Sequence, residues 1–191
     1  VNAERLASGK NPANCIWLWG EGRAIPWPSL AERFQVTGAV VASSAVHRGV
    51  GLCAGLDAAD AAESGDEPFK SMAATVLDEF AKKDFVYVHA SLSDEVVHGT
   101  DVNATVQAIE EFDRDLVGPI LEGLAKEGPY RFLALCDHGE GVEGQAFAVF
   151  GEGPGKDGAS GGRRFTESDA QDSKAPVRDA SKSVIKLFAK G

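Results

Sequence analysis

Residues 84–90 read DFVYVHA, and this β-rich, apolar run predicts a central strand of a buried sheet. A helix is predicted before it over residues 69–83, where apolar residues recur on one face. Residues 102–126 follow the strand and carry the strongest helical pattern of the chain. Pro119 lies within this pattern and is expected to kink the helix or end it early.

Two further strands are predicted, at residues 130–136 (YRFLALC) and 145–150 (QAFAVF). A glycine-rich loop at residues 151–162 and a closing helix over residues 176–189 complete this half of the chain. Apolar strands that alternate with helices need crossover connections. The sequence therefore predicts an α/β fold with a mostly parallel sheet that helices cover on both faces.

The part of the chain before residue 69 has a less regular pattern. CIWLW at residues 15–19 predicts a buried strand, residues 29–34 a short helix, and GAVVAS at residues 38–43 a second strand. The small, acidic stretch at residues 58–68 predicts a linker. We therefore expect a smaller lobe at residues 1–68 and a regular α/β unit at residues 69–191.

Composition limits the class of protein. The chain has 191 residues, a net charge of -10 and 43% hydrophobic residues, which is typical of a globular protein. This acidic charge argues against nucleic acid and against an anionic membrane surface as partners. The three cysteines are odd in number and widely spaced, which argues against a disulfide framework. They are expected to be buried packing residues, because each lies among apolar or small neighbours. A cytoplasmic location is expected, since the chain has neither a signal peptide nor a membrane-spanning run.

Two motifs that could bind a metal follow predicted strands. Asp94 and His98 lie just beyond DFVYVHA, and Asp137 and His138 come directly after YRFLALC. Ligands gather at the carboxyl ends of the strands in such sheets, and oxygen and nitrogen ligands suit divalent ions. The alternatives are ordinary ones: Asp94 could cap a helix, and a histidine beside an aspartate could be a surface pair.

Two other histidines are weaker candidates. His89 lies inside the apolar strand, which favours a hydrogen-bonded core histidine over a metal ligand. His47, in SSAVHRGVG, gives a still weaker signal.

The motifs occur in an order that resembles the archaeal-type cofactor-independent phosphoglycerate mutases, relatives of alkaline phosphatase. The segments that carry the resemblance cover most of the chain: NPANCIWLWGEG (11–22), GAVVASSAVHRGVGLCAGLD (38–57), DFVYVHASLSDEVVHGTD (84–101), AIEEFDRDLVGPIL (108–121), YRFLALCDH (130–138) and FTES (165–168).

The resemblance implies a three-layer α/β/α fold of the alkaline-phosphatase type, with residues 1–68 as part of an inserted substrate-binding lobe. It implies that Asp94, His98, Asp137 and His138 bind divalent metal, Mn first, with Zn, Mg or Co as alternatives. It also implies a glycolytic enzyme that interconverts 3-phosphoglycerate and 2-phosphoglycerate through a phosphoserine. A phosphorylated small metabolite would be the ligand.

The chain also departs from the family pattern. It has no counterpart of the family's N-terminal half, which carries the nucleophilic serine and another metal-binding aspartate. The histidine expected after the second motif is missing, and residues 139–150 read GEGVEGQAFAVF instead. Three hypotheses therefore remain: a mutase-like enzyme, a non-catalytic binding or assembly module, or phosphoryl transfer to a different substrate. A half-sheet would expose an edge and an apolar face, so self-association, or pairing with a missing N-terminal half, is expected.

Overall fold

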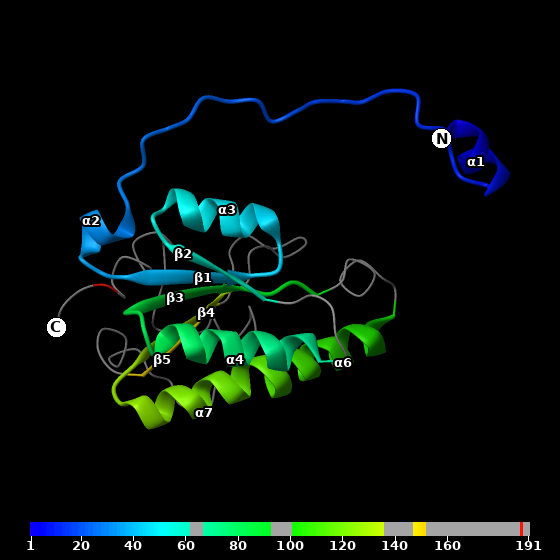
Figure 1. Cartoon of the computed structure of the whole chain (residues 1–191). Coiled ribbons are helices and arrows are strands. Elements are labelled where there is room, and N and C mark those ends of the chain that lie inside the picture. The colour runs from blue at the N-terminus through cyan, green and yellow to red at the C-terminus, as the bar shows by residue number, and fades with distance from the viewer. Residues whose placement is uncertain (62–66, 93–100, 136–146, 152–187, 189–191) are drawn as a thin grey trace.

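The structure is a computed structural model, and it describes residues 1–61, 67–92, 101–135, 147–151 and 188. An α/β body contains the helices and strands from residue 30 onward, and the chain before residue 30 extends away from this body (Figure 1). The loop expected at residues 151–162 and the helix expected at residues 176–189 lie outside the described residues, apart from Gly151 and Phe188.

Three parallel strands form the main sheet in the order β2-β1-β3. They are β1 (Gly38–Ala42), β2 (Asp57–Asp60) and β3 (Phe85–His89). Strands were predicted where β1 and β3 lie, in a mostly parallel sheet, and the parallel pairing of these two strands confirms this. β1, whose five residues are all buried, is the middle strand of this sheet. The prediction that DFVYVHA is the central strand is therefore wrong for the described sheet, where it pairs only with β1.

Helices cover both faces of this sheet, as predicted. α3 (Ala45–Cys53) contacts β1 and β2 on one face, and α4 (Pro68–Phe80) contacts β1 and β3 on the other (Figure 1). The main core lies on the α4 side and contains eight buried residues: Val41, Ala61, Met72, Ala73, Val76, Leu116, Ile120 and Leu124. The predicted apolar face of α4 is thus the face that is buried.

The long helix predicted at residues 102–126 has three parts. α6 (Val102–Phe112) is followed by a π-helical turn at Asp113–Val117 and then by α7 (Gly118–Glu127). Asp101 caps α6, because its side chain accepts hydrogen bonds from two backbone N–H groups of the first turn. Pro119 lies in the first turn of α7, where a missing N–H is tolerated best. The helix does not end early at this proline, because a π-helical turn precedes it and helical structure continues to Glu127.

The last two described strands form a separate antiparallel pair. β4 (Arg131–Leu135) and β5 (Phe147–Gly151) lie where strands were predicted, and Leu133 pairs with Val149. The expected parallel arrangement is wrong here. Residues 136–146 connect the two strands, and this segment is shorter than the dozen or so residues that a parallel crossover needs.

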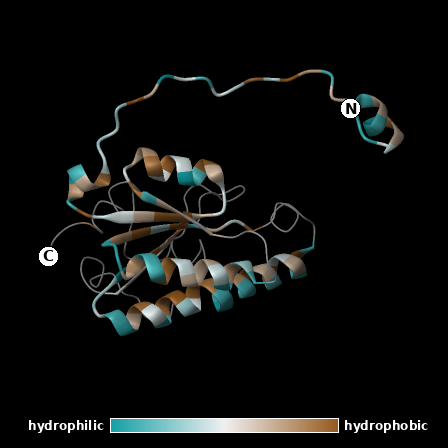
Figure 2. Cartoon of the chain, in the orientation of Figure 1, coloured by the Kyte–Doolittle hydropathy of each residue, from teal (hydrophilic) through white to brown (hydrophobic). Residues whose placement is uncertain are grey.

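Residues 15–19 (CIWLW) were expected to form a strand and to be buried, and both expectations are wrong. α1 (Asn2–Ala7) lies far from the body, and an extended arm joins it to α2 (Leu30–Phe34), which begins with a capping box at Ser29 (Figure 1). The arm contains CIWLW, which is neither a strand nor buried, since Ile16, Trp17, Leu18 and Trp19 are each 83–89% exposed. Apolar stretches are visible along the arm in Figure 2.

Two of the three cysteines also differ from expectation. Cys15 lies on the arm and Cys53 at the end of α3, and both are exposed free thiols. The prediction that they are buried is wrong, because Cys15 belongs to an exposed stretch of the arm and the side chain of Cys53 faces solvent at the end of α3. Cys136 lies outside the described residues.

The residues expected to form a linker before residue 69 include β2, which pairs with β1. The sheet therefore contains strands from both sides of the predicted boundary, because β1 and β2 precede residue 68 and β3 follows it. The division into a lobe at 1–68 and a phosphatase-like half at 69–191 stays a prediction. Within the described part of the chain, no helix is both long and apolar enough to cross a membrane.

Candidate functional site

The four predicted metal ligands lie outside the described residues. β3 ends at His89, and Asp94 and His98 follow in the segment 93–100. β4 ends at Leu135, and Asp137 and His138 follow it directly. Each motif therefore comes after the carboxyl end of a strand. Among the described residues themselves, no group of three or more histidine, cysteine, aspartate or glutamate side chains could hold a metal ion.

The carboxyl edge of the main sheet contains a pair of histidines that the sequence did not associate. His89 is the last residue of β3 and lies opposite Ala42, the last residue of β1. His47 belongs to the first turn of α3, which begins just after β1. The two imidazole rings stack face to face, with ring centroids 3.3 Å apart and an angle of 15° between the ring planes.

Both imidazoles place a nitrogen inside the protein. The Nδ1 atoms of His47 and His89 are buried, although the side chains as wholes are only half-buried. Within the described structure, Nδ1 of His47 has no hydrogen-bond partner. A buried polar atom in this state costs about 1–3 kcal/mol and calls for an explanation such as a bound ligand.

Arg48 brings a third basic group to the same edge. Its Nη1 donates a hydrogen bond to the backbone oxygen of Ala42 at 2.8 Å and another to that of Ser43. These two carbonyls stand at the end of β1, so the guanidinium group is held beside the strand end that faces His89. Ser44 precedes α3 without making a side-chain cap, and no acidic residue occupies the first turn.

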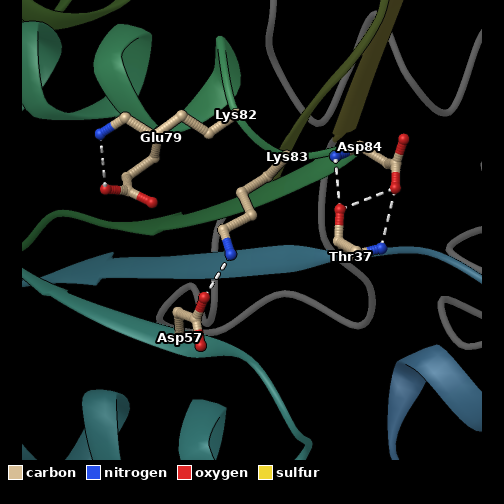
Figure 3. A network of polar contacts seen from close by, with 6 residues as sticks. All are labelled: Thr37, Asp57, Glu79, Lys82, Lys83 and Asp84. Carbon is tan, nitrogen blue, oxygen red and sulfur yellow. Dashed lines mark hydrogen bonds and ion pairs between the residues drawn. The ribbon is translucent and has the colours of Figure 1, made fainter.

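The opposite edge of the sheet is fixed by a polar contact between the starts of β1 and β3. The backbone N–H and the hydroxyl of Thr37 both donate to Oδ2 of Asp84 at 2.8 Å (Figure 3). These hydrogen bonds lower the pKa of the Asp84 carboxyl. The bond from the backbone N–H of Thr37 has the largest effect, and the bond from its hydroxyl has the next largest. The contact joins the residue before β1 to the residue before β3, at the amino ends of the two paired strands.

A second polar contact extends this arrangement to β2. The ammonium group of Lys83 binds the carboxylate of Asp57, the first residue of β2 (Figure 3). All three strands are thus connected by polar side chains at their amino ends, and the basic groups His47, Arg48 and His89 gather at the other end. Sequence reasoning missed this cluster because residues 47 and 89 are distant in the chain. One indication of the pair was present in the sequence: His47 follows a predicted strand, and His89 lies near the end of another.

Comparisons with known proteins show that the chain is similar to metalloenzymes. The sequence model of the Metalloenzyme superfamily matches residues 62–146, a range that contains all four predicted metal ligands. A protein of Geobacter sulfurreducens, named as a probable 2,3-bisphosphoglycerate-independent phosphoglycerate mutase, is 41% identical over 137 residues, or 70% of this chain and 34% of that protein. The 2,3-bisphosphoglycerate-independent phosphoglycerate mutase of Methanothrix thermoacetophila is 37% identical over 147 residues, or 75% of this chain and 38% of that protein.

One solved structure is also similar to this chain. The structure of the PH0037 protein from Pyrococcus horikoshii matches 64% of this chain and 33% of its own, with a TM-score of 0.50 and 25% sequence identity. This chain spans about a third of the length of the relatives it matches. It is a relative of the archaeal-type 2,3-bisphosphoglycerate-independent phosphoglycerate mutases, and its residues 62–146 match the metalloenzyme superfamily.

Proposed function

We propose that this chain is the metal-binding part of a phosphoglycerate mutase-like enzyme, with Asp94, His98, Asp137 and His138 as ligands of a divalent cation. The observation that supports this most strongly is the family match over residues 62–146, which includes both motifs. The donor set suits the role, because carboxylate oxygens and imidazole nitrogens bind Mn, Zn, Mg or Co. Manganese is the first candidate. A bound cation would neutralise phosphate charge in a chain whose net charge is -10.

The proposed reaction interconverts 3-phosphoglycerate and 2-phosphoglycerate through a phosphoserine, in the cytoplasm. The resemblance places the serine and a further metal-binding aspartate in the family's N-terminal half, to which this sequence has no counterpart. The matched relatives are about three times as long as the part of them that this chain covers. We therefore expect turnover only when the remaining part of such an enzyme is supplied, on the same chain or on a partner.

Metal binding tests the first half of this proposal. Calorimetric titration with Mn²⁺ is expected to show binding to the full chain, and Asp94→Asn and Asp137→Asn are each expected to weaken it by at least about tenfold. Glu110→Gln is a suitable control, because it removes an exposed carboxylate from α6. Equal affinities in all four proteins would contradict the ligand assignment.

Activity tests the second half. The full chain is mixed with a fragment of the Geobacter sulfurreducens relative that supplies the part this chain does not cover, and mutase activity is measured with 3-phosphoglycerate. We expect activity only in the Mn²⁺-loaded mixture, and its loss in the Asp137→Asn variant. Transfer to another phosphate acceptor in the same mixture would favour a different substrate on this scaffold.

The second candidate function is a non-catalytic binding or assembly module. Two observations favour it: the missing histidine after the second motif, and the exposed apolar arm, on which Trp17 and Trp19 are 83% and 85% exposed. This candidate predicts that Mn²⁺ neither binds nor raises the melting temperature, because a ligand stabilises only a protein that binds it. The Mn²⁺ titration therefore discriminates between the two functions.

A further inference from the structure

The outer face of α3 exposes a stripe of apolar side chains. Val46, Val50 and Cys53 follow one another at intervals of four and three residues, so they share one face of the helix. Val46 is 72% exposed and Val50 is 53% exposed, and Cys53 is exposed as well. A different face packs on the sheet, where a Cβ atom on the buried Gly51 would meet Val40. α3 is therefore apolar towards solvent as well as towards the core.

The arm supplies a second exposed apolar surface, at residues 16–19. This run has no charged side chain, and residues 36–56, which include α3, contain no aspartate or glutamate although the chain has 29 of them. Where these two surfaces meet, the repulsion between two copies of a chain with a net charge of -10 is therefore weak. α6 also exposes apolar residues, but Glu110 and Glu111 lie within it, and covering that helix would take their carboxylates out of water.

The arm and α3 match in length. Residues 15–19 span about 17 Å when they are extended, at about 3.3–3.6 Å per residue. The nine residues of α3 span about 14 Å. Trp17 and Trp19 are two residues apart, so they project to the same side of an extended chain. One arm is therefore long enough to lay both indole rings along the stripe of α3.

The root of the arm directs it away from α3 of the same copy. The backbone N–H of Leu30 donates to the carbonyl oxygen of Ala54 at 2.9 Å, which anchors the arm at the end of α3. Residues 25–28 read IPWP, and each proline fixes its own φ and restricts the residue before it to extended backbone. The arm thus leaves the body along a stiff, extended segment (Figure 1). This geometry favours the α3 of a second copy over that of the same chain.

Reciprocal contact between two copies would bury enough area for a stable dimer. A tryptophan side chain buries about 150–250 Å² when it is covered. Trp17 and Trp19 of both copies would together bury about 600–1,000 Å² on the arms. The surfaces that they cover lose a similar area, so the total reaches about 1,200–2,000 Å², which is the size of a standard protein interface.

We propose that the apolar run at residues 16–19 of one copy binds the outer face of α3 of a second copy, at Val46, Val50 and Cys53, and that the exchange is reciprocal. A two-fold pair of this kind has two identical contacts, each between an arm and an α3, so the assembly closes at two copies. The interface needs no metal and does not include the predicted metal ligands. It therefore does not depend on the proposed function.

Sedimentation of variants in EDTA and a thiol reductant tests which surface receives the arm. The double variant Val46→Ser with Val50→Ser makes the stripe of α3 polar, and its dimer dissociation constant should be at least about tenfold weaker than that of the parent. Val102→Ser with Val106→Ser is the matched control, because it changes two similarly exposed valines with the same spacing on α6, and it should dimerise as the parent does. Unchanged dimerisation of the α3 variant would overturn the proposal.

Alkylation of Cys53 tests the contact in the unmodified chain, so the test stays valid if a variant misfolds. The chain is treated with excess iodoacetamide at increasing protein concentration, and peptide mass spectrometry measures the modification rate. The rate should fall as dimer forms, and it should stay high at every concentration in the variant Trp17→Ser with Trp19→Ser. A rate that does not depend on concentration would overturn the proposal. If that constant rate is slow, each arm covers α3 of its own chain.

Discussion

Asp84 shows how a single side chain connects folding to pH in this protein. Its carboxylate accepts two hydrogen bonds from Thr37, which hold the starts of β1 and β3 together and lower its pKa. A carboxyl group whose pKa is lower in the folded state stabilises the fold above its unfolded pKa of about 3.9. That contribution is lost as the pH falls through the lower, folded pKa.

The first prediction follows from this contact. Asp84→Asn should make the free energy of unfolding less sensitive to pH below about pH 4, because the substituted amide cannot titrate. Thr37→Ala should reduce the sensitivity only in part, since the backbone N–H of residue 37 still donates. Urea unfolding over a pH series measures both, with Asp113→Asn, an exposed aspartate of the π-helical turn, as the control. Identical pH profiles for all four proteins would contradict the role of Asp84.

Two glycines of α3 give a second residue-scale prediction. A Cβ atom on Gly51 would lie 2.3 Å from Cγ1 of Val40, so this glycine lets α3 approach β1 closely, whereas a Cβ on Gly49 would meet nothing within 4 Å. Gly51→Ala should therefore destabilise the protein by about 1–3 kcal/mol. Gly49→Ala should stabilise it by up to about 1 kcal/mol through helix propensity. Urea denaturation compares the two, and equal effects would show that α3 does not pack on Val40.

The candidate site shows how far sequence reasoning reaches at this scale. Motifs such as Asp94 with His98 can be read from local spacing, because both residues lie in one short segment. The pair of His47 and His89 could not be read in this way, because parallel strand pairing brings them together from distant parts of the chain. Local sequence does not show which strands are neighbours in the sheet.

At the scale of elements, the long helix from Val102 to Glu127 is buried only in its second part. Ile120 in α7 is 4% exposed, whereas Ile109 in α6 is 53% exposed, although both are apolar residues of the helix predicted at residues 102–126. Helical periodicity predicted the helix and its apolar residues correctly. It could not predict where along the helix the sheet and α4 would supply partners.

This difference gives a third prediction with matched residue types. Ile120→Ala should lower the free energy of unfolding by about 2–5 kcal/mol, because it leaves a cavity in the core. Ile109→Ala should change it by no more than about 0.5 kcal/mol, because that side chain is largely in water already. Chemical denaturation of both variants measures the contrast. A large effect of Ile109→Ala would mean that α6 is covered in solution.

The strands show the same limit on prediction. Apolar runs correctly predicted β1, β3, β4 and β5, because the residues of each run are themselves apolar and favour burial. CIWLW has the same preference but has no partner among the described residues, so it is not a strand. β2 was missed because Asp57–Asp60 is short, small and acidic, and it gains strand structure only by pairing with β1.

At the scale of the whole molecule, the exposed arm and the partial length of the chain point to association. The segment at residues 16–19 exposes four large apolar side chains, and the matched relatives are far longer than this chain. Contiguous exposed apolar surface favours contact with another protein surface. In a solution of this chain alone, the available surface is that of another copy.

Light scattering tests this fourth prediction. The mass of the full chain should rise above that of a monomer as concentration increases, and the double variant Trp17→Ser with Trp19→Ser should restore the monomer mass. Leu6→Ser, which removes an exposed apolar side chain from α1, is the control and should still associate. A monomer mass for the unmodified chain at high concentration would show that the arm does not mediate self-association.

The position of the arm also has a spectroscopic consequence. All three tryptophans of the chain, Trp17, Trp19 and Trp27, lie in the segment between α1 and α2. Intrinsic tryptophan emission therefore reports on this segment and is nearly silent about the α/β body. A melting curve recorded by indole fluorescence would follow a different event from one recorded by circular dichroism, and disagreement between the two would not by itself indicate a folding intermediate.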